Sequence, residues 1–277
     1  MAEKKKMKKK NKIILLYVLL GVCVTAFLVF GGWLGYELYM DRQSQQYYTT
    51  LSGGVETRPR EPGYSKPAPS TPTQTPGEED DTEEPEEEFV WEPYVDFAAL
   101  NDVYPGIVAW IKLEGTPLDY PIMQTDNNYF FLSHLPDGTK HRSGSVFLDY
   151  RNSPDFSDKN SCLYGHWSRS DDMFGVLKNY RNQAFFEENP VIHIYTPEAD
   201  FELVLFAGYL VDSGVEQPTI KFRDDEHFMG YIKDKTRRSF FKSDVEVTAD
   251  DRIVSLCTCA YDYTNARFIV VGKLVEF

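Results

Sequence analysis

The sequence predicts a mainly β domain, a mixed β-barrel with inserted helices, that follows an N-terminal transmembrane helix. Short β-rich runs recur at irregular spacing from residue 107 to the C-terminus. Two helical patterns interrupt these runs, and one apolar run near the N-terminus is long enough to cross a bilayer. We find no internal repeat and no glycine-rich phosphate loop.

The predicted strands are runs rich in β-branched and aromatic residues. The first, Ile107 to Lys112, follows the turn signal Pro105-Gly106. The others are Ser145 to Leu148, Ser161 to Tyr164, Val191 to Tyr195, Phe201 to Val211, Arg252 to Cys257 and Arg267 to Val275.

Three segments of the globular part have helical patterns. A short one, Asp96 to Asn101, precedes the first strand, and another covers Met173 to Asn179. The longest is Asp224 to Phe241. Its buried face is predicted by the helical spacing of Phe228, Tyr231, Ile232 and Lys235.

The N-terminal region has the composition of a membrane anchor. Residues 1–12 contain seven lysines, and the next 24 residues, Ile13 to Tyr36, contain no Asp, Glu, Lys or Arg. At about 1.5 Å per residue, this run spans a hydrocarbon core of about 30 Å. The lysines on one flank, against Glu37 and Asp41 on the other, place the N-terminus in the cytoplasm and the rest of the chain outside.

A cleaved signal peptide is the alternative to this anchor. The apolar region of a signal peptide usually holds only about 7 to 15 residues, and Phe27 to Leu34 contains no clear small-x-small cleavage site. Length therefore favours an uncleaved transmembrane helix over residues 13–36, with residues 1–12 as a cytoplasmic tail.

Residues 37–88 are expected to form a disordered spacer. From Gly53 onward the segment consists of Pro, Ser, Thr and Gly followed by the acidic run Glu78 to Glu88, with too little apolar surface to offset its ordering entropy. Residues 89–277 have the size of one globular domain. The net charge of −14 excludes a nucleic-acid-binding protein, which needs a basic surface.

Three of the four cysteines lie outside the expected membrane helix: Cys162, Cys257 and Cys259. An exported domain with three cysteines cannot pair all of them internally, so at least one thiol is free or pairs with another chain. Cys162 lies in an apolar strand and is expected to be structural.

Cys259 lies where a predicted strand runs out into a loop, and Arg267 lies where the next strand begins. The ends of two strands in a hairpin are neighbours, so the thiol and the guanidinium can approach each other. A nearby guanidinium favours a thiolate and can hold a developing oxyanion. The pair is therefore a candidate for nucleophilic catalysis, and a buried structural thiol is the alternative.

A cysteine nucleophile needs a proton partner, and the context favours His166 among the five histidines. His166 follows the strand Ser161 to Tyr164 through Gly165, so it also lies at a strand end. His193 lies inside an apolar alternation and is expected to be an ordinary strand residue. The remaining histidines are expected at the surface: His134, His141 and His227.

Two motifs, in this order along the chain, resemble those of sortases. Leu163 to His166 resembles the segment that carries the catalytic histidine of the family. Ser255 to Cys259 resembles the signature Thr-Leu-x-Thr-Cys, which an arginine and a Val-rich strand follow. The resemblance covers Val95 to Phe277. Three further segments resemble class B sortases: Phe147 to Asn152, Asp172 to Phe174, and the helix Asp224 to Phe241.

The resemblance implies an eight-stranded β-barrel with an N-terminal helical segment and a long helix between strands six and seven. It assigns Cys259 as the nucleophile, His166 as the general acid/base and Arg267 as the stabiliser of substrate and oxyanion. Cys257 stands where a serine is frequent in the family, and it is expected to share a strand face with Cys259. The expected groove residues are Thr258, Asn128, Leu132 and Cys257.

The resemblance further implies acyl transfer at the outer face of the membrane, without a metal or organic cofactor. The expected substrates are C-terminal sorting motifs of secreted proteins, cleaved after a threonine, and the expected acceptor is an amine of a peptidoglycan precursor. A pilin lysine, and hence a pilin-polymerising sortase, is the alternative acceptor. Outside the family, a papain-like hydrolase normally places its cysteine before its histidine, and a non-catalytic anchored binding module stays open as an alternative.

Overall fold

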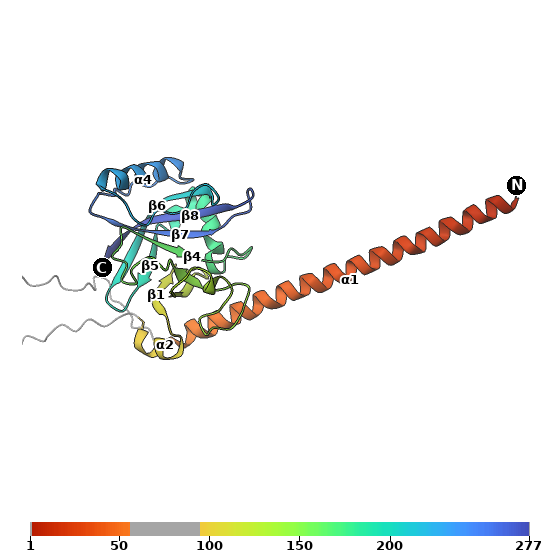
Figure 1. Ribbon diagram of the computed structural model, residues 1–277, viewed down its shortest axis with the longest axis horizontal. Coiled ribbons are helices and arrows are strands. Elements are labelled where there is room, and N and C mark those ends of the chain that lie inside the picture. The colour runs from red at the N-terminus through yellow and green to blue at the C-terminus, as the bar shows by residue number, and fades with distance from the viewer. Residues whose placement is uncertain (1, 56–94, 277) are drawn as a thin grey trace, which may run out of the picture. The chain divides into compact units, whose positions relative to one another are not determined.

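The computed structural model describes residues 2–55 and 95–276, and the chain divides into two compact units at Thr49. The first unit ends at Thr49 and contains most of the helix α1, which runs from Ala2 to Gly54 (Figure 1). All side chains from Ile13 to Tyr36 are exposed. Among the described residues, α1 is the one helix whose length and apolar composition suit a membrane span, with a mean hydropathy of 2.9 over its most apolar window.

The expectation of a disordered spacer is wrong for residues 37–54, which continue α1. The first proline after the apolar run is Pro59, and residues 37–51 are rich in the helix formers Glu, Leu, Met, Arg and Gln. The change to a helix-breaking composition comes at Gly53, where α1 ends within one residue. Residues 56–88 of the expected spacer lie outside the described residues.

The second unit contains a closed barrel of eight strands, which confirms the predicted fold class. The strands are β1 (Ile107–Lys112), β2 (Asp119–Met123), β3 (Val146–Leu148), β4 (Asn160–Tyr164), β5 (Val191–Tyr195), β6 (Asp200–Asp212), β7 (Arg252–Cys259) and β8 (Ala266–Glu276). Their order around the barrel is β1-β2-β3-β4-β7-β8-β6-β5. The pairs β2–β3 and β4–β7 are parallel and the other neighbours are antiparallel, so the barrel is mixed.

Within residues 95–276, five helical segments accompany the barrel. They are α2 (Phe97–Val103), the 3-10 helices η1 (Phe130–Leu132) and η2 (Met173–Arg181), α3 (Gln183–Glu188) and α4 (Asp225–Arg238). The side chain of Asp224 caps α4 by accepting from the amide of His227 at 2.8 Å. The predicted helix extended to Phe241, but Ser239 already has an extended backbone, so α4 ends at Arg238.

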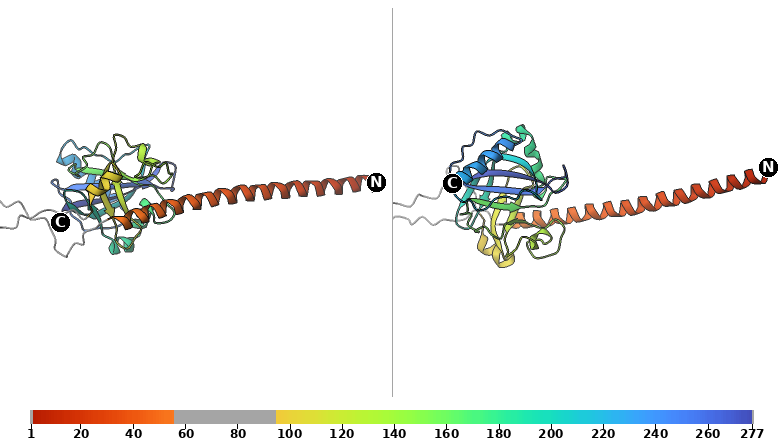
Figure 2. Two further views of the ribbon diagram at one scale, coloured as in Figure 1. Left: turned by 90° about the horizontal axis from the view of Figure 1, so that it is seen from below. Right: turned by 45° about the horizontal axis from the view of Figure 1, so that its top comes forward.

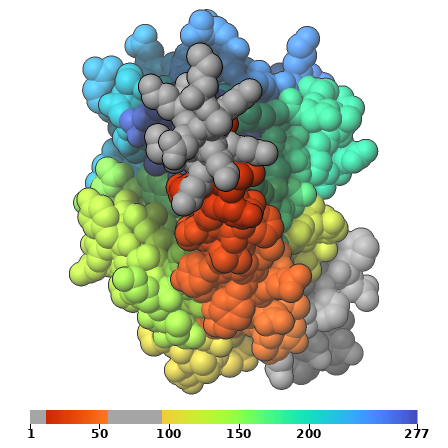
Figure 3. All heavy atoms as spheres, turned by 90° about the vertical axis from the view of Figure 1, so that its right-hand side faces the viewer, coloured from red at the N-terminus to blue at the C-terminus, as the bar shows by residue number. Residues whose placement is uncertain are grey.

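Helix α4 lies between β6 and β7 in the chain and covers the face of the barrel that bears the buried cysteine of β7. Phe228 and Ile232 of α4 belong to one buried cluster with Tyr209 of β6, Ile269 of β8 and Cys257 of β7. In Figures 1 and 3, α4 lies at the top of this unit, and Figure 2 shows β7 and β8 running side by side next to it. This close packing holds β6, β7 and β8 in place relative to one another.

Candidate active site

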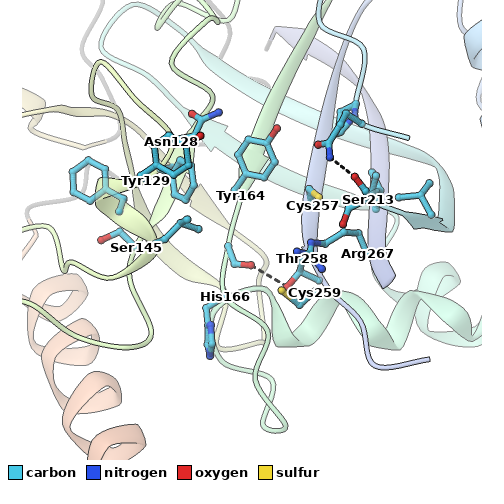
Figure 4. Close-up of a pocket in the computed structure, with 18 of the residues that line it drawn as sticks. Asn128, Tyr129, Ser145, Tyr164, His166, Ser213, Cys257, Thr258, Cys259 and Arg267 are labelled. Carbon is cyan, nitrogen blue, oxygen red and sulfur yellow. Dashed lines mark hydrogen bonds between the residues drawn. The ribbon is translucent and has the colours of Figure 1, made fainter. Parts of the chain in front are cut away.

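A cavity of about 470 Å³ lies beside the ends of β4, β7 and β8 (Figure 4). Loops around residues 128–132 and 213–218 complete its walls. All seven residues that the sequence predicts for the site line this cavity: His166, Cys259, Arg267, Thr258, Asn128, Leu132 and Cys257. The fold therefore brings the predicted set together.

Cys259 and Arg267 face each other across the hairpin of β7 and β8. They are partners in the strand register, and the amide of Ala260 donates to the carbonyl of Ala266 at 2.9 Å just beyond them. The two residues are thus paired across the hairpin, as the sequence predicts for their positions at neighbouring strand ends. The thiol is free and half-buried, and the Arg267 guanidinium donates to the carbonyl of Ala266 at 3.0 Å. A positive charge therefore flanks an accessible sulfur.

His166 reaches the same cavity because β4 runs parallel to β7. The amide of Gly165 donates to the carbonyl of Cys257 at 3.2 Å, and the hydroxyl of Thr258 donates back to the carbonyl of Gly165 at 2.9 Å. These two hydrogen bonds hold the segment that carries His166 against the strand that carries Cys259. In Figure 4 the imidazole of His166 is turned away from the sulfur of Cys259.

Gly165 has no side chain, and this leaves room for the ring of Phe174 beside its backbone. A Cβ at this position would lie 2.5 Å from the ring of Phe174. The amide of Phe174 in turn donates to the carbonyl of His166 at 3.1 Å. The segment Asp172 to Phe174, noted in the sequence, therefore supports the backbone of the histidine from behind.

The two thiols of β7 lie in different environments. Cys257 is 6% exposed, and burial raises its pKa to about 12, although the charge of Arg267 acts in the opposite direction. Cys259 is half-buried at the strand end. Both line the cavity, as expected for positions two apart on a strand. A reactive thiolate at neutral pH is therefore not expected at Cys257.

The wall opposite the cysteines contains Asn128 and Leu132. Asn128 donates from Nδ2 to the buried carboxylate of Asp149 at 2.9 Å and accepts the amide of Tyr150 at 2.9 Å. Leu132 is 58% exposed at the rim. The predicted groove residue Thr258 lines the cavity too, but its hydroxyl is already committed to Gly165.

Sequence reasoning missed Tyr164 and Glu216, which also line the cavity. Lys235 and Arg238 of α4 both donate to Glu216, the latter at 2.8 Å. Burial by itself raises the pKa of Glu216, but these hydrogen bonds bring it below the ordinary value, so the carboxylate is charged and paired. No local pattern marks Glu216, because its two partners lie 19 and 22 residues further along the chain.

The other histidines contribute no group to this cavity among its lining residues. His193 lies in β5, as expected for an ordinary strand residue. The expectation of a surface position is wrong for His141, which is 4% exposed. Its amide donates to the carbonyl of Ser133 at 2.9 Å and its Nδ1 lies 2.7 Å from the hydroxyl of Ser143, so a polar loop folds around the ring. Cys162 is buried, and burial raises its pKa well above the ordinary value.

Known proteins share this domain. A family model described as Sortase domain matches residues 111–275. The chain belongs to the sortase family. Sortase B of Staphylococcus aureus is 34% identical over 182 residues, which cover 65% of this chain and 75% of that protein. Sortase B of Listeria monocytogenes is 30% identical over 259 residues, which cover 92% of this chain and 95% of that protein.

Solved structures agree with the class B resemblance of this sortase. A Staphylococcus aureus sortase B–substrate complex matches with a TM-score of 0.62 at 34% identity, covering 65% of this chain and 84% of the other. The sortase B from B. anthracis in complex with AAEK1 matches with a TM-score of 0.67 at 26% identity, covering 87% and 99%. This sortase is therefore a cysteine transpeptidase with class B relatives.

Proposed function

We propose that this sortase cleaves a C-terminal sorting motif of secreted proteins after a threonine and transfers the protein to an amine of a peptidoglycan precursor. The observation that carries the proposal is the placement of Cys259 opposite Arg267, with His166 lining the same cavity. Nucleophile, proton carrier and cation are the groups that acyl transfer from a peptide requires.

The proposed reaction has two halves. The Cys259 thiolate attacks the threonine carbonyl, and Arg267 stabilises the negative oxygen of the tetrahedral intermediate. The peptide C–N bond then breaks, and protonated His166 gives its proton to the departing amine. The acceptor amine next attacks the thioester, loses a proton to His166 and releases the Cys259 thiolate. Because the imidazole is turned away from the sulfur in Figure 4, the side chain of His166 has to rotate before the proton transfers.

The acceptor and the substrate are supported by the relatives. One related structure is a sortase B–substrate complex, and another is a sortase B complexed with triglycine. Triglycine presents a primary amine, which is the chemistry that the second half of the reaction needs. We therefore propose an amine of a peptidoglycan precursor peptide as the acceptor here.

The location of the reaction follows from the N-terminal region. We propose that residues 13–36 span the membrane, that the lysines of residues 1–12 stay in the cytoplasm, and that the domain over residues 89–277 lies outside. The apolar and exposed surface of this part of α1 supports a lipid-facing helix. Segments after residue 36 then form the spacer that carries the catalytic domain.

Two substitutions test the proposed roles. Cys259→Ala is expected to abolish cleavage of a Pro-x-Thr-type peptide, and His166→Ala is expected to lower kcat by about 10²- to 10⁴-fold, the usual contribution of a general acid/base. Cleavage and transfer are measured by chromatography with triglycine as the acceptor. Cys257→Ser is the matched control and is expected to keep most of the activity. Full activity in Cys259→Ala or His166→Ala would contradict the proposal.

A further inference from the structure

The segment Phe147 to Asn152 resembles class B sortases, yet none of its side chains takes part in the proposed reaction. It begins in β3, and Asp149 follows directly after this strand. The side chain of Asp149 is fully buried. A buried carboxylate requires hydrogen-bond partners, and those of Asp149 lead to the cavity.

Five donors converge on this one carboxylate. The amide and Nε of Arg151 donate to Oδ1 at 3.0 and 2.8 Å. A guanidinium NH2 of Arg151 donates to Oδ2 at 2.8 Å, and Asn128 Nδ2 and the Tyr164 hydroxyl donate to the same oxygen at 2.9 and 3.1 Å. Asn128 and Tyr164 both line the cavity, whereas Asp149 lies behind them.

The charge state of Asp149 decides how its partners are oriented. Burial alone raises the pKa of this carboxyl, but the hydrogen bonds from Arg151 and Asn128 bring it below the ordinary value. The group is therefore an ionised carboxylate, which can only accept hydrogen bonds. Each of its partners must donate.

A tyrosine hydroxyl has one hydrogen, and the hydrogen of Tyr164 is committed to Asp149. Tyr164 can then offer the cavity only the lone pairs of its oxygen. The amide of Asn128 is fixed at both ends, because Oδ1 accepts from Tyr150 and one Nδ2 hydrogen goes to Asp149. Its other Nδ2 hydrogen is not used by these two bonds and can donate to a ligand. Figure 4 shows Asn128 and Tyr164 on the same side of the cavity.

We infer that Asp149 is a positioning residue that sets the hydrogen-bonding polarity of this wall, so that Tyr164 accepts a backbone N–H of the bound sorting peptide. Asn128 correspondingly donates to a carbonyl of the peptide. The inference rests on the proposed peptide substrate. An adjacent acceptor and donor match the two polar groups of a peptide unit.

Ester analogues of the peptide test this polarity in the full-length chain in detergent. In each analogue, one backbone N–H of a Pro-x-Thr-type peptide is replaced by oxygen, which removes a donor. The wild type is expected to prefer the amide about tenfold in kcat/KM at one position, the equivalent of about one hydrogen bond. Tyr164→Phe is expected to remove that preference. Asp149→Asn is expected to weaken it, because a carboxamide at this position could donate to Tyr164 and turn the hydroxyl hydrogen toward the cavity.

Asp158→Asn is the matched control. Asp158 lies on the same loop and accepts from Asn152 and from the amide of Ser153 at 2.9 and 2.7 Å, but it does not line the cavity. This variant is expected to keep the amide preference of the wild type. An amide preference that is absent from the wild type, or that persists in Tyr164→Phe or in folded Asp149→Asn, would overturn the inference.

A second measurement does not depend on turnover or on the stability of Asp149→Asn. The side-chain amide signals of Asn128, recorded by NMR after 15N-asparagine labelling of the wild type, are expected to change with pH only below the ordinary aspartate range. Signals that titrate at or above that range, or that do not respond to acid at all, would overturn the inference. A wild type that cleaves no peptide would instead overturn the proposed function, and the NMR result would still test Asp149.

Discussion

Cys257 and Cys259 show how two positions along one strand change the chemistry of the same side chain. Both thiols line one cavity, and both are near Arg267 in the register of β7 and β8. Cys257 is enclosed by the cluster beneath α4, and burial raises its pKa to about 12. Cys259 stands where the strand ends and the cluster no longer covers it. A serine at position 257 would therefore leave Cys259, the proposed nucleophile, in place.

Alkylation with iodoacetamide tests this difference. At pH 7 we expect rapid modification at Cys259, which is half-buried and lies opposite Arg267. Modification at Cys257 should be slow, because the thiolate is the reacting form and burial raises the pKa of this thiol. Mass spectrometry of the tryptic peptide Ile253 to Arg267, which contains both thiols, locates the label. Cys257→Ser should react as the wild type does, and Cys259→Ser should lose the rapid phase. Rapid labelling at residue 257 of the wild type would contradict this assignment.

The turn after β4 carries His166, and its geometry depends on a close contact of Gly165. Gly165 is bonded to β7 through the carbonyl of Cys257 and the hydroxyl of Thr258, and the ring of Phe174 packs against its Cα. The turn, β7 and η2 therefore form one support for the histidine. A change at Gly165 should displace His166 without touching any group that reacts.

Gly165→Ala is expected to destabilise the domain by about 1–3 kcal/mol through overpacking and to lower kcat more than it raises KM. Gly230→Ala is the matched control, because a Cβ at Gly230 of α4 meets nothing within 4 Å. Alanine at this helical position should stabilise the protein by up to about 1 kcal/mol and leave activity unchanged. Thermal unfolding and peptide cleavage measure both effects. If the two variants have the same stability and the same activity, the ring of Phe174 moves aside without displacing the turn.

The strands of the barrel were largely predictable because most of them are apolar runs between turn signals. β2 was missed because it contains Pro121, which argues against a strand. In the structure Pro121 pairs with Trp110 of β1, whereas β3 pairs only with Ile122 and Met123. The short helix α3 was missed as well, since its six residues are too few to show a period.

Apart from the hairpin of β7 and β8, the pairing of the strands could not be predicted from the sequence. β4 and β7 are parallel neighbours although about 90 residues separate them, and this pairing is what brings His166 to Cys259. The pairing of Cys259 with Arg267 could be predicted, because the two residues lie at the ends of consecutive strands in a hairpin. Choosing His166 as the partner depended on its strand-end context and on the family resemblance, whereas Tyr164, Asp149 and Glu216 emerged only from tertiary contacts.

Carboxylates with shifted pKa values occur in several parts of the domain, and their titration bears on the stability of the whole molecule. The hydrogen bond from Arg237, with those from Lys235 and Arg238, lowers the pKa of Asp234 to about 2. The pKa values of several other carboxyls are also below their ordinary range: Asp149, Asp155, Glu216, Asp251 and Asp262. Burial acts in the opposite direction on Asp119, whose pKa is raised.

A lowered folded-state pKa adds stability above the unfolded-state pKa, and this stability is lost as the pH falls through the folded-state pKa. The melting temperature is therefore expected to be steady near neutral pH and to fall between about pH 4.5 and pH 2. Circular dichroism at a series of pH values measures this. Asp119 is the one described carboxyl whose pKa is raised. Its replacement in Asp119→Asn should not prevent the fall of the melting temperature in acid. A melting temperature that is unchanged between pH 5 and pH 2 would mean that these carboxylates do not couple folding to protonation.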